Sequence, residues 1–130
     1  MKSEIILLGH GSGGKLSHEL LDDLIVPILS GTEPRDQNDA AILARQQGRL
    51  AFTTDSYVVD PIFFPDGSIG SLAIYGTIND LAMTGAMPIA ISVGLILEEG
   101  LAVNTLRTIL EDMNAAAQKL SLIHISEPTR

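Results

Sequence analysis

The most apolar stretch of the chain, residues 89–97, restricts the fold more than any other feature. It reads Ile-Ala-Ile-Ser-Val-Gly-Leu-Ile-Leu, with apolar residues on both faces of an extended chain. A strand that is apolar on both faces is typical of the centre of a sheet covered on each side. The stretch is far shorter than the roughly 20 residues needed to span a membrane. We therefore expect a central strand here.

Helical periodicity occurs three times around this stretch. Leucine and isoleucine recur at helical spacing over residues 16–28. Ser68 can cap a second helix, which Gly85 and Pro88 close. A third helix is predicted over residues 103–120, with apolar residues along one stripe.

Two shorter strands are predicted at residues 40–43 and 50–54, beside turn-forming residues. Together with the stretch at 89–97 and the three helices, they predict an α/β (or α+β) domain. We expect a central mixed sheet with flanking helices.

Composition excludes several functional classes. The 16 acidic and 8 basic residues give a net charge of −8, which disfavours a nucleic-acid partner. The chain has no cysteine, so it has no disulfide framework and no thiolate metal site. It begins without a signal peptide and has no membrane-spanning segment, so we expect a cytoplasmic protein. A 45% hydrophobic content and a mean hydropathy of +0.28 indicate apolar surface buried against a second domain or subunit.

A glycine-rich segment leads directly into the first predicted helix. It reads Gly11-Ser12-Gly13-Gly14-Lys15. Glycines let backbone N–H groups close around an anion, and a helix amino terminus adds positive potential. Lys15 and His10, which borders the segment, are the candidate catalytic residues. Lys15 can contact a phosphate, and His10 can contact a phosphate or carry a proton. The alternatives are a flexible turn before a helix, and a histidine that is only a polar flank.

Asp80 is the only charged residue of the second predicted helix. The helical face that carries it is otherwise small and apolar, with Leu72, Gly76 and Met83. A carboxylate on such a face is unfavourable unless it is paired or bound to a cation, and it lies toward the carboxyl end of the helix dipole. A metal ion or a metal-bound phosphate would neutralise it. The alternative is a structural aspartate reached by a distant arginine.

Two further aspartates lie where predicted loops meet strands. Asp39 precedes the strand at 40–43, and Asp55 ends the strand at 50–54. With Asp80 they supply three carboxylates from three elements, the hard oxygen ligands that magnesium prefers. Each alone is more often a turn or cap residue. Together with the glycine-rich segment they favour a site for a nucleotide and magnesium.

These segments, taken in order, resemble the HypE family of hydrogenase maturation enzymes over residues 5–120. Residues 54–65 and 94–101 are the most specific to that family. Its relatives share the scaffold and the Asn79-Asp80 pair; they include aminoimidazole ribonucleotide synthetase (PurM) and selenophosphate synthetase. The matching segments are residues 10–16, 39–41, 52–61, 63–65, 70–73, 76–83, 85–88 and 92–101.

The resemblance implies a PurM-like amino-terminal domain whose sheet is shared across a homodimer, with ATP near the interface. Residues 11–15 match the loop near the phosphates, and Asn79 matches a nucleotide-binding position. Asp39, Asp55 and Asp80 match positions that hold Mg²⁺ and phosphates.

The implied reaction is the ATP-dependent dehydration of a carboxamide carried on the enzyme's own carboxyl-terminal cysteine. The product is a thiocyanate whose cyanide becomes an iron ligand in [NiFe] hydrogenase. The implied partners are a carbamoyltransferase and an iron-scaffold maturation protein. One alternative is a fragment of a PurM-like enzyme of the selenophosphate synthetase or aminoimidazole ribonucleotide synthetase type, against which residues 57–65 argue. The other is a non-catalytic dimerisation module.

The sequence departs from the family pattern in several places. The family has two acids where this chain has Asn38-Asp39, and both a Gly-Asp-Thr metal segment and the terminal cysteine are missing. Residues 121–130 match no preceding pattern and look like translated adaptor sequence, the alternative being a native strand at 122–125. We therefore assign the domain to residues 1–120, and expect a truncated chain that is inactive alone.

Overall fold

The computed structural model describes residues 1–30, 39–120 and 125–126. Asn38, which bears on the departure from the family pattern, lies outside the described residues, as does most of the alternative strand at 122–125. The elements are η1 (Leu8–Gly11), α1 (Lys15–Leu20), η2 (Leu21–Ile25), α2 (Val26–Leu29), β1 (Phe63–Phe64), β2 (Gly67–Ser68), α3 (Ile69–Ala82), β3 (Ile91–Ser92), α4 (Val103–Lys119) and β4 (Ile125–Ser126).

All three predicted helices are confirmed. The first is one helical stretch over residues 15–29, in which α1 passes into the π-helical segment η2 and then into α2. The second begins where expected, at Ser68, whose hydroxyl accepts the Gly70 N–H at 3.1 Å. Ser71 completes this cap by accepting the Ser68 N–H at 3.0 Å. A cap of this kind satisfies N–H groups that a helix leaves without partners.

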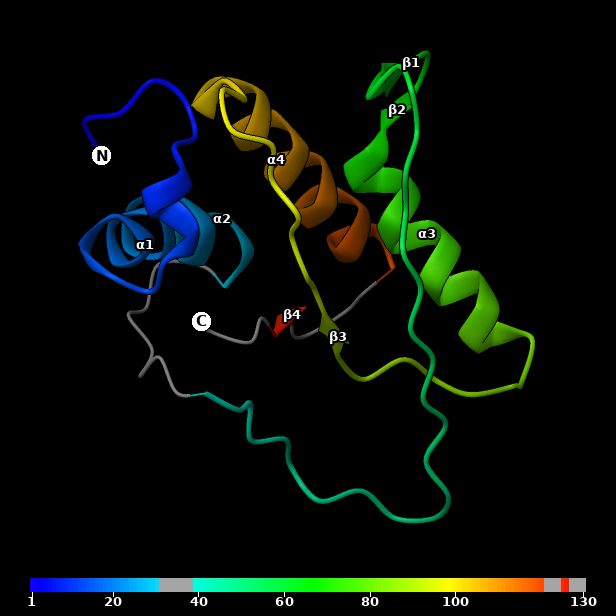
Figure 1. Ribbon diagram of the computed structural model, residues 1–130. Helices are drawn as coiled ribbons and strands as arrows, with labels where there is room; N and C mark the ends of the chain where they lie inside the picture. The colour runs from blue at the N-terminus through cyan, green and yellow to red at the C-terminus, as the bar shows by residue number, and fades with distance from the viewer. Residues whose placement is uncertain (31–38, 121–124, 127–130) are drawn as a thin grey trace.

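Helix α4 is the centre of the core. Figure 1 shows it between the α1–α2 stretch on one side and α3 on the other. Gly70 of α3 faces the backbone of α4 so closely that an added Cβ would lie 2.3 Å from the Ile109 carbonyl oxygen. Only glycine permits this approach. The buried core comprises Ile6, Leu20, Leu21, Leu24, Ile25, Leu29, Ile74, Ile78, Ile91, Val93, Val103, Leu106, Ile109, Leu110, Met113, Ala116 and Ala117.

The predicted central mixed sheet does not form within the described chain. The predicted strands at 40–43 and 50–54 are wrong, because residues 39–62 contain no helix or strand. The stretch at 89–97 is extended but pairs only at β3. There, Ile91 and Val93 are buried, whereas Ile96 is fully exposed, so one face is covered instead of two. A strand requires a hydrogen-bonded neighbour, which most of these segments lack in a single chain.

Two small pairings are present instead. Strands β1 and β2 form an antiparallel hairpin before α3. Strand β3 pairs in parallel with β4, so Ile91 is opposite Ile125 and Ser92 opposite Ser126. The fold class is thus α/β with little sheet. No helix among the described residues is long and apolar enough to cross a membrane.

The segment over residues 39–62 is largely exposed to solvent. Figure 1 shows it running away from the helices and returning beside α3. Tyr57 makes the contact, because its hydroxyl lies 3.4 Å from Thr77 Oγ1 and its ring covers Gly76. Three large apolar side chains of the segment are almost fully exposed: Ile42, Phe52 and Val58.

Candidate functional site

The glycine-rich segment forms a closed loop at the start of α1. The Ser12 hydroxyl donates to the Gly9 carbonyl oxygen at 2.8 Å. The Gly13 N–H donates to the Ser17 hydroxyl at 2.8 Å, and Gly13 has a φ of 79°, a conformation that favours glycine. The loop therefore has a defined shape held by its own hydrogen bonds.

The outer side of this loop is accessible and carries hydrogen-bond donors. Residues 11–15 are all exposed. In the part of the chain that the structure describes, the N–H groups of Gly14 and Lys15 have no hydrogen-bond acceptor. The Lys15 side chain is 89% exposed, with Nζ 3.9 Å from a Glu19 carboxylate oxygen. Such a weak, exposed pair leaves the ammonium group available, so the loop can bind an anion.

His10 lies on the other side of the loop. Its imidazole is 5% exposed, and Nδ1 accepts the Leu7 N–H at 2.8 Å. Because Nδ1 accepts, the proton of the neutral ring is on Nε2. That nitrogen is buried without a partner among the described residues. The placement favours the polar-flank interpretation over direct contact with an anion on the outer side.

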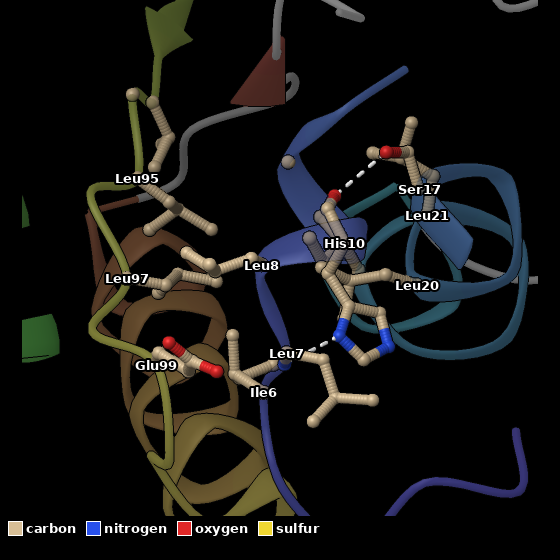
Figure 2. Close-up of a pocket in the computed structure, with 14 residues that line it drawn as sticks. Ile6, Leu7, Leu8, His10, Ser17, Leu20, Leu21, Leu95, Leu97 and Glu99 are labelled. Atoms are coloured by element: carbon tan, nitrogen blue, oxygen red, sulfur yellow. Dashed lines mark hydrogen bonds between the residues drawn. The ribbon is translucent and has the colours of Figure 1, made fainter. Parts of the chain in front are cut away.

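A cavity of about 480 Å³ lies beside His10, between the α1–α2 stretch and the extended chain that follows β3 (Figure 2). Its lining is mostly aliphatic, with His10, Ser17 and Glu99 as the side chains that carry polar atoms. Figure 2 shows the Ser17 hydroxyl bonded to the His10 carbonyl oxygen at the cavity wall. The aliphatic lining residues are Ile6, Leu7, Leu8, Leu20, Leu21, Ile25, Val93, Leu95 and Leu97.

The Asn79-Asp80 pair lies at the carboxyl end of α3. Both side chains are exposed, and Met83 on the same face is 87% exposed. The expectation of an apolar environment around Asp80 is therefore wrong for the single chain, because this face of α3 is open to solvent near its end. Because the Asp80 carboxylate is solvated, the single chain contains no buried charge at this position that a cation would have to neutralise.

The three candidate metal ligands are not gathered in one chain. Asp39 and Asp55 are exposed, like Asp80, and Asp55 Oδ1 accepts the Ser56 N–H at 2.9 Å. Among the described residues, no group of three histidine or acidic side chains could hold a metal ion. Carboxylate oxygens suit magnesium, but this arrangement does not form a metal centre within a single chain.

Ser17, in the first turn of α1, supports the loop and is not among the predicted site residues. Ser17 is 4% exposed and joins the beginning and the middle of the glycine-rich loop. A signal is visible in retrospect, because Ser17 is a polar residue on the same helical face as Leu20, Leu21 and Leu24. A serine on an otherwise apolar, buried face requires a hydrogen-bond partner.

Comparison with known proteins identifies close relatives of the whole chain. Residues 37–126 match the family model described as AIR synthase related protein, N-terminal domain. The chain is 43% identical to carbamoyl dehydratase HypE of Escherichia coli K12, over 96% of this chain and 39% of that protein. It is 40% identical to carbamoyl dehydratase HypE of Cupriavidus necator H16, over 100% of this chain and 37% of that protein.

The fold also matches a solved structure. The crystal structure of hydrogenase maturation protein HypE in complex with ATP superposes with a TM-score of 0.80 and 45% sequence identity. The match covers 93% of this chain and 36% of that one. The chain thus spans somewhat more than a third of the length of these relatives.

Proposed function

We propose that the chain, which belongs to the AIR synthase related family and matches the N-terminal domain of that family, is the ATP-binding part of a carbamoyl dehydratase of the HypE type. The proposal rests on the glycine-rich loop, whose outer side has free N–H groups and an available lysine. The similarity of the chain to a HypE protein solved with ATP supports the same assignment.

We assign the phosphates of ATP to the outer side of this loop. The N–H groups of Gly14 and Lys15 would donate to phosphate oxygens, and the Lys15 ammonium group would add a charge. Asn79, exposed at the end of α3, would contribute an amide contact to the nucleotide. His10 would support the loop from inside, because its imidazole is committed to the Leu7 N–H.

The proposed ligands of magnesium are the carboxylates of Asp39, Asp55 and Asp80. Since one chain does not gather these carboxylates, we propose that they meet at an interface with a second copy, where ATP would also bind. The exposed apolar side chains beside them, such as Val58 and Met83, support such an interface. When bound, magnesium would neutralise charge on the phosphates.

The overall reaction requires parts beyond this domain. In the proposed scheme, the oxygen of a cysteine-bound carboxamide attacks the terminal phosphorus of ATP, and ADP leaves. Loss of phosphate from carbon, with both protons leaving the nitrogen, then produces the thiocyanate. This domain would contribute the site that orients ATP. A carbamoyltransferase and an iron-scaffold protein would be partners in the cytoplasm.

The test is binding of ATP by this chain, measured by calorimetry with and without magnesium. We expect binding that Lys15→Ala weakens about tenfold, because a charge-assisted contact contributes roughly 1.5–3 kcal/mol before screening. Lys119→Ala is the matched control, since it removes an exposed lysine at the end of α4 and should leave affinity unchanged. An absence of ATP binding at millimolar concentration would instead favour a non-catalytic dimerisation module.

A further inference from the structure

We propose that Ser17 is a positioning residue that sets the glycine-rich loop in the shape that accepts the phosphates of ATP. The proposal rests on the proposed function, since it concerns the same loop. It follows from the hydrogen bonds around one buried hydroxyl group.

The Ser17 hydroxyl joins two parts of the loop. It accepts the Gly13 N–H at 2.8 Å and donates to the His10 carbonyl oxygen at 2.7 Å. The Gly9 carbonyl oxygen lies at 3.5 Å, at the limit of a hydrogen bond. One side chain from the first turn of α1 therefore holds the beginning and the middle of the loop together.

These bonds determine which N–H groups the loop can offer to a ligand. The Gly13 N–H is occupied by Ser17, and the Ser12 N–H by the Gly9 carbonyl oxygen at 3.3 Å. Within the described chain, the Gly14 and Lys15 N–H groups are left without an acceptor, as are those of Leu16 and Ser17 in the first turn of α1. Ser17 itself is 4% exposed and cannot reach a ligand on that side. Its effect on ATP must therefore pass through the loop.

The loop depends on this support because glycines restrain it poorly. Gly11, Gly13 and Gly14 have many accessible backbone conformations in a loop without support. A loop that is already in its bound conformation loses less entropy on binding. Removal of the Ser17 hydroxyl would leave the Gly13 N–H without its acceptor. The loop could then bind a phosphate oxygen through Gly13 in a different geometry, or turn the Gly13 N–H inward. We expect weaker phosphate binding in either case.

The experiment compares a shape-matched pair, Ser17→Thr and Ser17→Val. Threonine keeps the hydroxyl and valine replaces it with a methyl group, while the cavity beside Ser17 gives room for the added group. Ser71→Ala is the control, because Ser71 makes a similar pair of bonds to Ser68 at the α3 cap, away from the loop. ATP and adenosine are the two probes. Affinities for both are measured by calorimetry, and melting temperatures by fluorimetry.

We expect Ser17→Val to weaken ATP binding about tenfold and to leave adenosine binding within about twofold, because only the phosphates meet the loop. Ser17→Thr should retain the wild-type ratio of the two affinities. Ser71→Ala should lower the melting temperature and leave the ratio unchanged. This change in ratio is one that a purely structural role of Ser17 would not produce.

Two results would overturn the proposal separately from the proposed function. In the first, wild type binds ATP and Ser17→Val binds it equally well. In the second, Ser17→Val loses ATP and adenosine binding to the same extent, which indicates general loss of structure. If the wild-type chain itself does not bind ATP, the proposed function fails, and the role of Ser17 fails with it.

Discussion

At the scale of single residues, the exposed position of Asp80 means that its charge has little effect on the stability of the fold. The carboxylate is exposed at the end of α3, so it stays hydrated in the folded chain and needs no partner to offset a desolvation penalty. Ser17 is the opposite case, because it is buried and its hydroxyl is fully used by the loop. A functional residue in this domain is therefore not recognisable by burial alone.

We predict that Asp80→Asn weakens magnesium-dependent ATP binding about tenfold and leaves the free energy of unfolding within about 0.5 kcal/mol. Asparagine keeps the shape and removes the charge that attracts the cation. The measurement is ATP affinity with and without magnesium, paired with a denaturation curve. Asp66→Asn is the control, since Asp66 is exposed with a φ of 66°, a conformation that asparagine also adopts. Equal ATP affinity in the presence of magnesium for Asp80→Asn and wild type would exclude Asp80 as a ligand.

At the scale of elements, α3 and α4 approach each other closely at a glycine. Gly70 lies on the buried face of α3, and Ile109 of α4 places its carbonyl oxygen where a Cβ would be. Helices approach this closely only where a small residue lies at the crossing. Ile74 and Leu110, both fully buried, form the core around that crossing.

We predict that Gly70→Ala destabilises the domain by about 1–3 kcal/mol, because a methyl group against backbone forces the helices apart. Thermal unfolding should show this as a fall of several degrees. Gly94→Ala provides the comparison, since nothing lies within 4 Å of its added Cβ and its φ is not positive. A melting temperature for Gly70→Ala equal to that of Gly94→Ala would show that the two helices can separate without cost.

At the scale of the whole molecule, apolar surface remains uncovered along residues 39–62 and beyond α3. Val58 is 96% exposed and Met83 is 87% exposed. Large apolar side chains in one region of a surface mark an interaction site. The extended segments beside them also carry backbone groups available for pairing with another chain.

We predict that the chain forms a homodimer at high micromolar concentration and that Val58→Lys shifts it toward monomer. The side chain is exposed in the single chain, so the substitution should leave the monomer fold intact while placing a charge in the interface. Light scattering gives the mass, and circular dichroism confirms the helices. Gln118→Lys, on the exposed side of α4, should remain dimeric. A wild-type chain that stays monomeric in this range contradicts the prediction.

We predict that deletion of residues 121–130 lowers the melting temperature by only a few degrees. Within the described chain, β4 contributes a pairing with Ile91 and Ser92 alone, and such a short ladder adds on the order of 1 kcal/mol. A loss of many degrees would show instead that this tail is a native strand of the domain. Thermal unfolding of the full and shortened chains distinguishes the two outcomes.

The sequence by itself determined the helices, the family and the glycine-rich loop. A helix satisfies its hydrogen bonds within a few residues, so the spacing of Leu20 and Leu24, or the cap at Ser68, is sufficient to predict it. The strands predicted at 40–43 and 50–54 do not form in the described chain, because a strand exists only with a hydrogen-bonded neighbour and local sequence does not supply one. Tertiary structure alone decided that Asp80 is exposed, that the three aspartates are not gathered in one chain, and that Ser17 holds the loop. Each of these depends on which segments lie together after folding, and local periodicity carries no information about that.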